Sequence, residues 1–131
     1  MNTHITLAQI NPELGAIDAN LNQILDAIEQ AKAQASDLII FPECALTGYP
    51  LKDLVFQASL HKHIACALQR LIQASETIAI VVGYPKIIDH QIYNCAGWFF
   101  KGKIVQEYKK QALANMSCFD EMRIFKSAPP Q

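Results

Sequence analysis

Two segments of the chain repeat their apolar residues with the period of an α-helix. The first begins near Asp18, whose side chain can cap a helix, and ends before Ser36. The second fades around Ser75-Glu76. Because apolar residues recur at i, i+3, i+4 and i+7, each segment should form an amphipathic helix with one face on the rest of the protein. Those positions are Leu21, Ile24, Leu25, Ile28 and Ala31 in the first segment, and Leu60, Ile64, Leu68, Leu71 and Ile72 in the second.

Three other segments have the pattern of β-strands. Apolar and polar residues alternate over 4–10, and the chain then reaches Asn11-Pro12, where proline prevents a simple continuation. Residues 37–41 and 78–82 are short and continuously apolar, as expected of strands that are covered on both faces. The two apolar runs therefore predict strands inside a sheet.

Turn signals indicate how the strands are connected. The tripeptide Gly-Tyr-Pro occurs at 48–50 and again at 83–85, and it predicts a turn after each of the two buried strands. Two further strand-like runs, 92–100 and 103–108, are joined through Lys101-Gly102-Lys103. This junction predicts a β-hairpin with glycine at the position that needs a positive φ.

The order β-α-β-α-β-β-β predicts an α/β fold with a mixed sheet and helices on one face. Residues 111–131 contain no convincing further element, and residues 127–131 have the composition of a connecting loop. We therefore expect residues 1–131 to be a fragment of a longer protein.

Composition and charge exclude several classes of function. The chain has 131 residues and a net charge of −1, and it shows no Lys/Arg cluster that would attract nucleic acid or an anionic membrane. The N-terminus lacks the pattern of a signal peptide, and no apolar run is long enough to cross a bilayer, so we expect a cytoplasmic protein.

Metal and disulfide sites are not expected either. The four cysteines are unevenly spaced and form no CxxC pair, which indicates reduced thiols. His61 and His63 are two residues apart on a predicted helix and should point to different faces, so they are poorly placed to share a metal ion.

One carboxylate stands where α/β proteins often place chemistry. Glu43 follows Pro42 directly after the buried run 37–41, and ligand sites in such sheets usually lie beyond the carboxyl ends of the strands. Glu43 is therefore a candidate general base. A solvated loop charge and a helix cap are the alternatives that this stretch alone leaves open.

Four motifs in order give the chain a specific resemblance. They are Phe-Pro-Glu at 41–43 with the following Gly-Tyr, the YNxA turn at 93–96, YxKxxL at 108–113, and FDExRxF at 119–125. This set resembles the nitrilase, or carbon–nitrogen hydrolase, superfamily over essentially the whole chain. PExxLTGYP and FDExRxF are most similar to the glutaminase domain of glutamine-dependent NAD synthetases.

The resemblance implies an αββα fold and a role for four residues. Glu43 would be the general base and Lys110, the lysine of YxKxxL in preference to Lys109, would stabilise the oxyanion. Glu121 would orient the ammonium and the substrate amide, and Tyr49 would lie at the substrate pocket. The alternatives are a surface lysine, an exposed acid and an aromatic residue that only packs.

The chain also departs from the pattern of that family. The related glutaminases commonly read LPNY after the lysine, whereas this chain has Leu-Ala-Asn-Met at 113–116, which puts substrate positioning at Met116 in doubt. The family's nucleophilic cysteine follows a further strand, beyond residue 131. We do not expect any cysteine of this chain to replace it, because each should be a small buried or partly buried side chain. These four are Cys44, Cys66, Cys95 and Cys118.

The resemblance thus predicts the N-terminal part of a glutamine amidohydrolase domain that supplies ammonia for NAD synthesis and is inactive alone. Glutamine, a synthetase domain or complementary C-terminal fragment, and further copies of the chain would be its partners. No GxGxxG or GxxxxGK[ST] motif occurs, so no nucleotide or other cofactor is expected within these residues. The alternatives are a non-catalytic remnant or interaction module of the same fold, and another nitrilase-family amidase.

Overall fold

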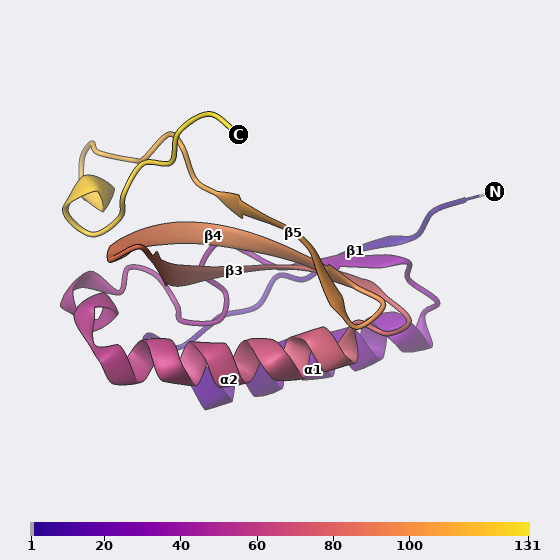
Figure 1. Ribbon diagram of the computed structural model, residues 1–131. Helices are drawn as coiled ribbons and strands as arrows, with labels where there is room; N and C mark the ends of the chain where they lie inside the picture. The colour runs from indigo at the N-terminus through magenta and orange to yellow at the C-terminus, as the bar shows by residue number, and fades with distance from the viewer. Residues whose placement is uncertain (1) are drawn as a thin grey trace.

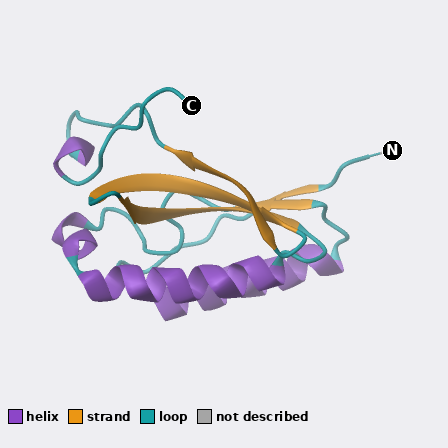
Figure 2. Ribbon diagram, viewed as in Figure 1, coloured by secondary structure: helices purple, strands orange, loops and turns teal. Residues whose placement is uncertain are grey.

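The chain forms one mixed β-sheet with two long helices on the same face (Figure 1). The computed structural model describes residues 2–131. Figure 2 shows the sheet and the helices as two layers, with irregular chain leading to the C-terminus. The expected α/β class, mixed sheet and one-sided helices are confirmed. The elements are β1 (Ile5–Leu7), α1 (Ile17–Ala33), β2 (Leu38–Ile40), η1 (Lys52–Phe56), α2 (Ala58–Ala74), β3 (Ala79–Ile88), β4 (Gln91–Phe100), β5 (Lys103–Lys109) and η2 (Glu121–Arg123), where η denotes a 3₁₀-helix.

The strand directions bring two distant parts of the chain to one end of the sheet. The spatial order is β1-β2-β3-β4-β5; the first three strands are parallel, and β4 pairs antiparallel with both β3 and β5. Strand β5 therefore runs in the same direction as β2. Because the carboxyl ends of both strands lie at the same end of the sheet, the residues that follow Ile40 and Lys109 can meet there.

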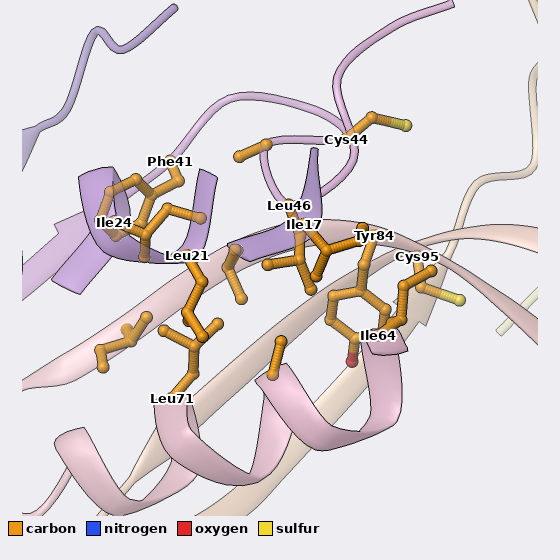
Figure 3. Packing of buried hydrophobic residues seen from close by; sticks show 14 of the residues in the cluster. Ile17, Leu21, Ile24, Phe41, Cys44, Leu46, Ile64, Leu71, Tyr84 and Cys95 are labelled. Carbon is orange, nitrogen blue, oxygen red and sulfur yellow. The ribbon is translucent and has the colours of Figure 1, made fainter. Parts of the chain in front are cut away.

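The core lies between the two helices and the sheet. Ile24 and Ile28 of α1, Leu71 of α2, and Ile80 of β3 are fully buried. Figure 3 shows side chains of both helices packed around Tyr84, whose ring is also inaccessible to solvent. The apolar stripes read from the sequence are therefore the faces that the helices bury.

The predicted cap of the first helix is wrong. Helix α1 begins at Ile17, Asp18 lies inside its first turn, and no side chain caps its N-terminus by a hydrogen bond. The chain is instead held at this point by Asn20, whose Oδ1 accepts a hydrogen bond from the backbone N–H of Glu13 at 2.7 Å. Asp18 still carries a negative charge close to the helix N-terminus, where the helix dipole favours it.

The second Gly-Tyr-Pro tripeptide is not a turn, contrary to expectation. Strand β3 continues through residues 83–85 and pairs with β4 as far as Ile88. Strand β2 pairs with β3 only up to Val81, so Pro85 lies where β3 has a strand neighbour on one side only. Proline is tolerated in such an edge position because no ladder hydrogen bond is lost there.

Two tight hairpins connect β3, β4 and β5. The predicted one is confirmed, with φ of 53° at Lys101 and 70° at Gly102. The other turns through Asp89 and His90, which have φ of 49° and 64°. Positive φ at both central residues suits the twist of a two-residue hairpin. The second hairpin has no glycine at its turn, so the sequence does not predict it.

The face of the sheet away from the helices is apolar and open. Register places Val81, Trp98 and Gln106 side by side across β3, β4 and β5 on this face. Trp98 is 42% exposed and Tyr108 46% exposed. No helix within residues 2–131 is long and apolar enough to cross a membrane.

Candidate active site

The segment after β2 holds Glu43 against β3. Phe41 N–H donates a hydrogen bond to Val81 O at 2.9 Å, and Leu46 N–H donates to Gly83 O at 3.2 Å. A Cβ on Gly83 would come within 2.5 Å of Cys44 N, so only glycine lets this segment lie so close to the strand. The backbone thus fixes the position from which the Glu43 side chain extends.

Lys110 is positioned by the end of β5 and by the C-terminal residues. Its backbone N–H donates to Asn94 O at 2.8 Å, which continues the pairing of β5 with β4. Its carbonyl accepts from Ala128 N–H at 3.1 Å. The lysine is therefore fixed on both sides where the strand ends.

Glu121 is a buried acid, not the exposed one that its neighbour Asp120 suggested. It opens η2, and only 4% of its side chain is exposed. Its backbone N–H donates to Ala114 O at 3.0 Å, and its carbonyl accepts from Phe125 N–H at 2.7 Å. These bonds hold the turn so that the carboxylate points towards Lys110.

The structure brings the three predicted charged residues together. Lys110 Nζ lies 2.9 Å from Glu43 Oε1 and 3.1 Å from Glu121 Oε1. Burial lowers the pKa of Lys110, but hydrogen bonds and charges from both glutamates outweigh it and raise that pKa above its ordinary value. Lys110 is thus a fully charged ammonium with one N–H beyond the two that these bonds use.

Asn94 is a fourth polar residue of this cluster, and the sequence alone assigns it no role. It is 3% exposed, and its Nδ2 donates to Glu43 Oε1 at 2.5 Å. The signal that could have found it was the YNxA motif, which contains Asn94 but says nothing of what the side chain contacts. A residue 51 positions away from Glu43 is linked to it only by the fold.

Tyr49 lies beside the cluster without joining it closely. Its hydroxyl is 3.4 Å from Glu121 Oε1, which is long for an O–H···O hydrogen bond. Burial and the neighbouring Glu121 raise the pKa of Tyr49 to about 12, so the phenol stays protonated. Its ring contacts Phe119, with centroids 6.3 Å apart.

Two cavities adjoin the charged cluster. One of about 250 Å³ is lined by Glu43, Asn94 and Lys110 and reaches the open face of the sheet at Tyr108. The other, of about 460 Å³, has Tyr49 and Glu121 in its wall. Within residues 2–131, Glu121 Oε2 is a buried oxygen without a hydrogen-bond partner. Such an atom is costly unless a ligand or water supplies a donor.

The second cavity is mostly apolar, and Met116, where the sequence put substrate positioning in doubt, is not in its wall. Met116 is 77% exposed. The wall consists of two chain segments: Tyr49, Pro50, Leu51 and Lys52, and Cys118, Phe119, Asp120, Glu121, Arg123, Ile124 and Phe125.

Two of the four free cysteines are buried and two are exposed. Cys44 and Cys95 are buried as expected, and burial, with smaller contributions from Glu43 and Glu107 respectively, raises the pKa of each thiol to about 12. Cys66 and Cys118 are exposed, so the expectation that they are at least partly buried is wrong. Cys66 is two residues from buried Ile64, which turns it to the solvent side of α2.

The histidines and acids form no metal site in the part of the chain that the structure describes. His61 Nε2 lies 2.6 Å from Val55 O, while His63 pairs with Asp18 at 3.7 Å. The two side chains therefore have separate partners.

Comparison with known proteins assigns the chain to a family. A family model described as carbon-nitrogen hydrolase matches residues 4–128. The chain belongs to the carbon–nitrogen hydrolase family. Among curated relatives, the glutamine-dependent NAD(+) synthetase of Xylella fastidiosa is 36% identical over 126 residues, which are 95% of this chain and 23% of that protein. This carbon–nitrogen hydrolase chain therefore spans about a quarter of the length of that relative.

Solved structures agree with this assignment. The glutamine-dependent NAD+ synthetase of Acinetobacter baumannii has a TM-score of 0.91 and 35% identity, with 96% of this chain and 24% of that chain covered. An amidase from Nesterenkonia sp. has a TM-score of 0.86 at 24% identity and covers 98% of this chain and 49% of its own. The second likeness shows the fold alone, which is the nitrilase type that the sequence predicted.

Proposed function

We propose that residues 1–131 are the N-terminal part of a glutaminase domain that hydrolyses glutamine and supplies ammonia for NAD synthesis. One observation carries this proposal: Lys110 Nζ lies within 3.1 Å of the carboxylates of both Glu43 and Glu121. Amide hydrolysis through a thiol needs a base to take the thiol proton and a donor to stabilise the oxyanion, and Glu43 and Lys110 can fill these two roles, with Glu121 orienting the ammonium. The relatives at 36% and 35% identity, named glutamine-dependent NAD synthetases, support glutamine as the amide.

The donors and acceptors that the cluster leaves unused suit the reaction. Glu43 Oε1 accepts from Asn94 and Lys110, which leaves Oε2 to take the proton of a cysteine thiol. The resulting sulfur nucleophile attacks the amide carbon, and the remaining N–H of Lys110 donates to the oxyanion. Protonated Glu43 returns its proton to the departing nitrogen, and ammonia leaves. Water then cleaves the thioester, releasing glutamate and restoring the thiol.

The nucleophile has to come from outside the described cluster. The thiol of Cys44, although next to Glu43 in sequence, is 1% exposed and its pKa is raised to about 12, so it stays protonated and out of reach of substrate. On this proposal a cysteine carried by another part of the domain approaches Glu43 from the 250 Å³ cavity.

Glu121 supports the assignment of the substrate amide. Its buried Oε2 has no hydrogen-bond donor within residues 2–131, and the carboxylate lies in the wall of the 460 Å³ cavity. A primary amide carries two N–H donors, one of which can satisfy this oxygen. Tyr49, from the same wall, would limit the space around the substrate.

The open face of the sheet supports a further partner. Trp98 and Tyr108 are exposed side by side with Val81 on a sheet face that no helix of residues 2–131 covers. Large exposed apolar patches usually mark interfaces. We propose that a complementary part of the domain, joined to a synthetase domain, covers this face and brings the nucleophile.

A chimera tests the function directly. Residues 1–131 replace the matching N-terminal segment of the A. baumannii synthetase, and glutamine-dependent ammonia release is measured. We expect release in the chimera and its loss, by about 100-fold or more, in Glu43→Gln and Lys110→Ala. Lys109→Ala is the matched control: its ammonium lies over the Tyr93 ring, 5.2 Å from the centroid, and it should leave release unchanged.

Synthesis of NAD from added ammonia shows whether the chimera is folded. A chimera that uses ammonia but releases none from glutamine contradicts the proposal and favours a non-catalytic remnant. Release from short aliphatic amides in preference to glutamine favours another nitrilase-family amidase.

A further inference from the structure

Asn94 contacts the charged cluster through both its side chain and its backbone. Its Nδ2 donates to Glu43 Oε1 at 2.5 Å, and its backbone carbonyl accepts from Lys110 N–H at 2.8 Å. Its Oδ1 accepts from the thiol of Cys44 at 3.5 Å. One residue of β4 thus contacts the base through its side chain and the lysine through its backbone.

The chemistry of the three partners fixes which way the amide faces. An ionised carboxylate can only accept, so the NH₂ end of Asn94 must be the end that meets Glu43. The Oδ1 end then needs a donor, and the Cys44 thiol supplies one. Burial, with a smaller contribution from Glu43, raises the pKa of this thiol to about 12, so the thiol keeps the proton that it donates.

The Glu43 side chain has few other restraints. It is 50% exposed, whereas Glu121, the other carboxylate bonded to Lys110, is 4% exposed. Within the described chain its carboxylate bonds only to Asn94 and Lys110. Without the amide, Glu43 has one flexible lysine as its sole anchor and is free to turn into solvent.

We propose that Asn94 is a positioning residue that holds the Glu43 carboxylate in place, and that the thiol of Cys44 sets the orientation of the Asn94 amide. That the positioned carboxylate acts as a base rests on the proposed function. That Asn94 positions the carboxylate does not, because this is a property of the chain itself.

The consequence for the reaction lies in which oxygen of Glu43 remains free. Asn94 and Lys110 both bond to Oε1, so the same oxygen is occupied and Oε2 is left free on a residue that lines the 250 Å³ cavity. A base whose free lone pair is fixed transfers a proton without first having to reorient. Loss of this positioning is therefore expected to lower kcat more than it changes KM.

The test uses the 131-residue chain and nuclear magnetic resonance. In the unsubstituted chain we expect an ordered Glu43 side chain and a downfield, slowly exchanging Asn94 amide proton. Asn94→Ala should make the Glu43 side chain mobile. Ser75→Ala is the control, since it also removes a buried hydrogen-bonding side chain, one that bonds Ile72 and Gly102 far from the cluster. It should leave Glu43 ordered.

A second pair of variants tests the thiol. Cys44→Ala should broaden or shift the Asn94 amide resonance, because the amide loses the donor that fixes it. Cys95→Ala removes a buried thiol that donates to Tyr93 O at 3.8 Å and not to Asn94, so the Asn94 amide resonance should stay sharp and downfield. If Asn94→Ala does not fold, the resonance in Cys44→Ala still decides the thiol's part, and Glu43→Ala decides the carboxylate's by removing the downfield shift.

The proposal is overturned if Glu43 is equally ordered in Asn94→Ala and in the unsubstituted chain. It is also overturned if the side-chain amide resonance of Asn94 changes in neither Cys44→Ala nor Glu43→Ala. These measurements need no catalysis, so they stand even if the chimera proves inactive. In an active chimera, Asn94→Ala should lower kcat by about 100-fold with little change in KM, whereas Ser75→Ala should lower neither.

Discussion

Addition of a single methyl group at Gly83 should displace the segment that carries Glu43 while the rest of the fold is kept. A Cβ built there lies 2.5 Å from Cys44 N, 3.0 Å from Pro42 O and 3.1 Å from the carbonyl carbon of Glu43. All three atoms belong to backbone, which cannot rotate away as a side chain would. In Gly83→Ala the segment 42–44 must therefore move off β3.

The size of the movement follows from the contact distances. An ordinary van der Waals contact of Cβ begins near 3.4 Å, so the gap of 2.5 Å requires a displacement of somewhat less than 1 Å. Overpacking of this kind typically costs about 1–3 kcal/mol. For a chain of this length we expect the melting temperature to fall by roughly 3–10 °C. A shift of about 1 Å at the base would lower turnover of an active chimera by about 100-fold.

Amide hydrogen exchange locates the damage. Leu46 N–H donates to Gly83 O at 3.2 Å, and this bond should open when the segment lifts, so Leu46 should lose protection. Gly97→Ala is the matched control because its Cβ would meet the Tyr84 hydroxyl at 2.5 Å, inside the core and away from Glu43. It should also lower the melting temperature, but it should leave Leu46 protected. Equal protection of Leu46 in both variants would refute the reasoning.

Three smaller predictions concern thiols and ion pairs. A thiol reagent should modify Cys66 and Cys118 quickly in the native chain and reach Cys44 and Cys95 only on unfolding, so four fast thiols would contradict the burial. Because burial raises the pKa of Cys44 from 9.0 to about 12 in the folded chain, the unfolded chain loses this proton first, and stability should fall by up to about 4 kcal/mol as the pH rises from 9 towards 12. The melting temperature of Cys44→Ala should thus decrease less steeply over that pH range than that of the unsubstituted chain. Arg123→Ala breaks only exposed ion pairs, so urea unfolding should show a loss below about 1 kcal/mol.

The parts of the fold that sequence predicted are those with local causes. The stripe from Leu21 to Ala31 follows from the helical period, and the turn at Gly102 follows from the one residue type that favours its φ. Pro85 was misread for the opposite reason. Whether a proline ends a strand depends on which neighbours the strand has beyond it, and that is decided by β2 ending at Ile40.

The site divides in the same way. Glu43 and Lys110 were found through motifs, and Glu121 through its match to FDExRxF, yet the motif could not tell that its side chain is 4% exposed. The hydrogen bond from Asn94 to Glu43 has no local cause at all. It exists because the segment after β2 and the strand β4 both lie against β3, which brings Glu43 and Asn94 together.

The charges of the cluster constrain how a glutaminase built on it would work. Two carboxylates face one ammonium, so the formal charge of Glu43, Glu121 and Lys110 together is −1. An incoming cysteine thiolate would add a second negative charge, which its neighbours oppose. The thiol should therefore stay protonated at rest and give its proton to Glu43 only as sulfur attacks the amide. The active chimera can show this, because alkylation of its catalytic thiol by iodoacetamide should increase with pH well above neutrality. A thiol that is fully reactive at pH 6 would mean that the rest of the domain supplies a positive charge absent from residues 2–131.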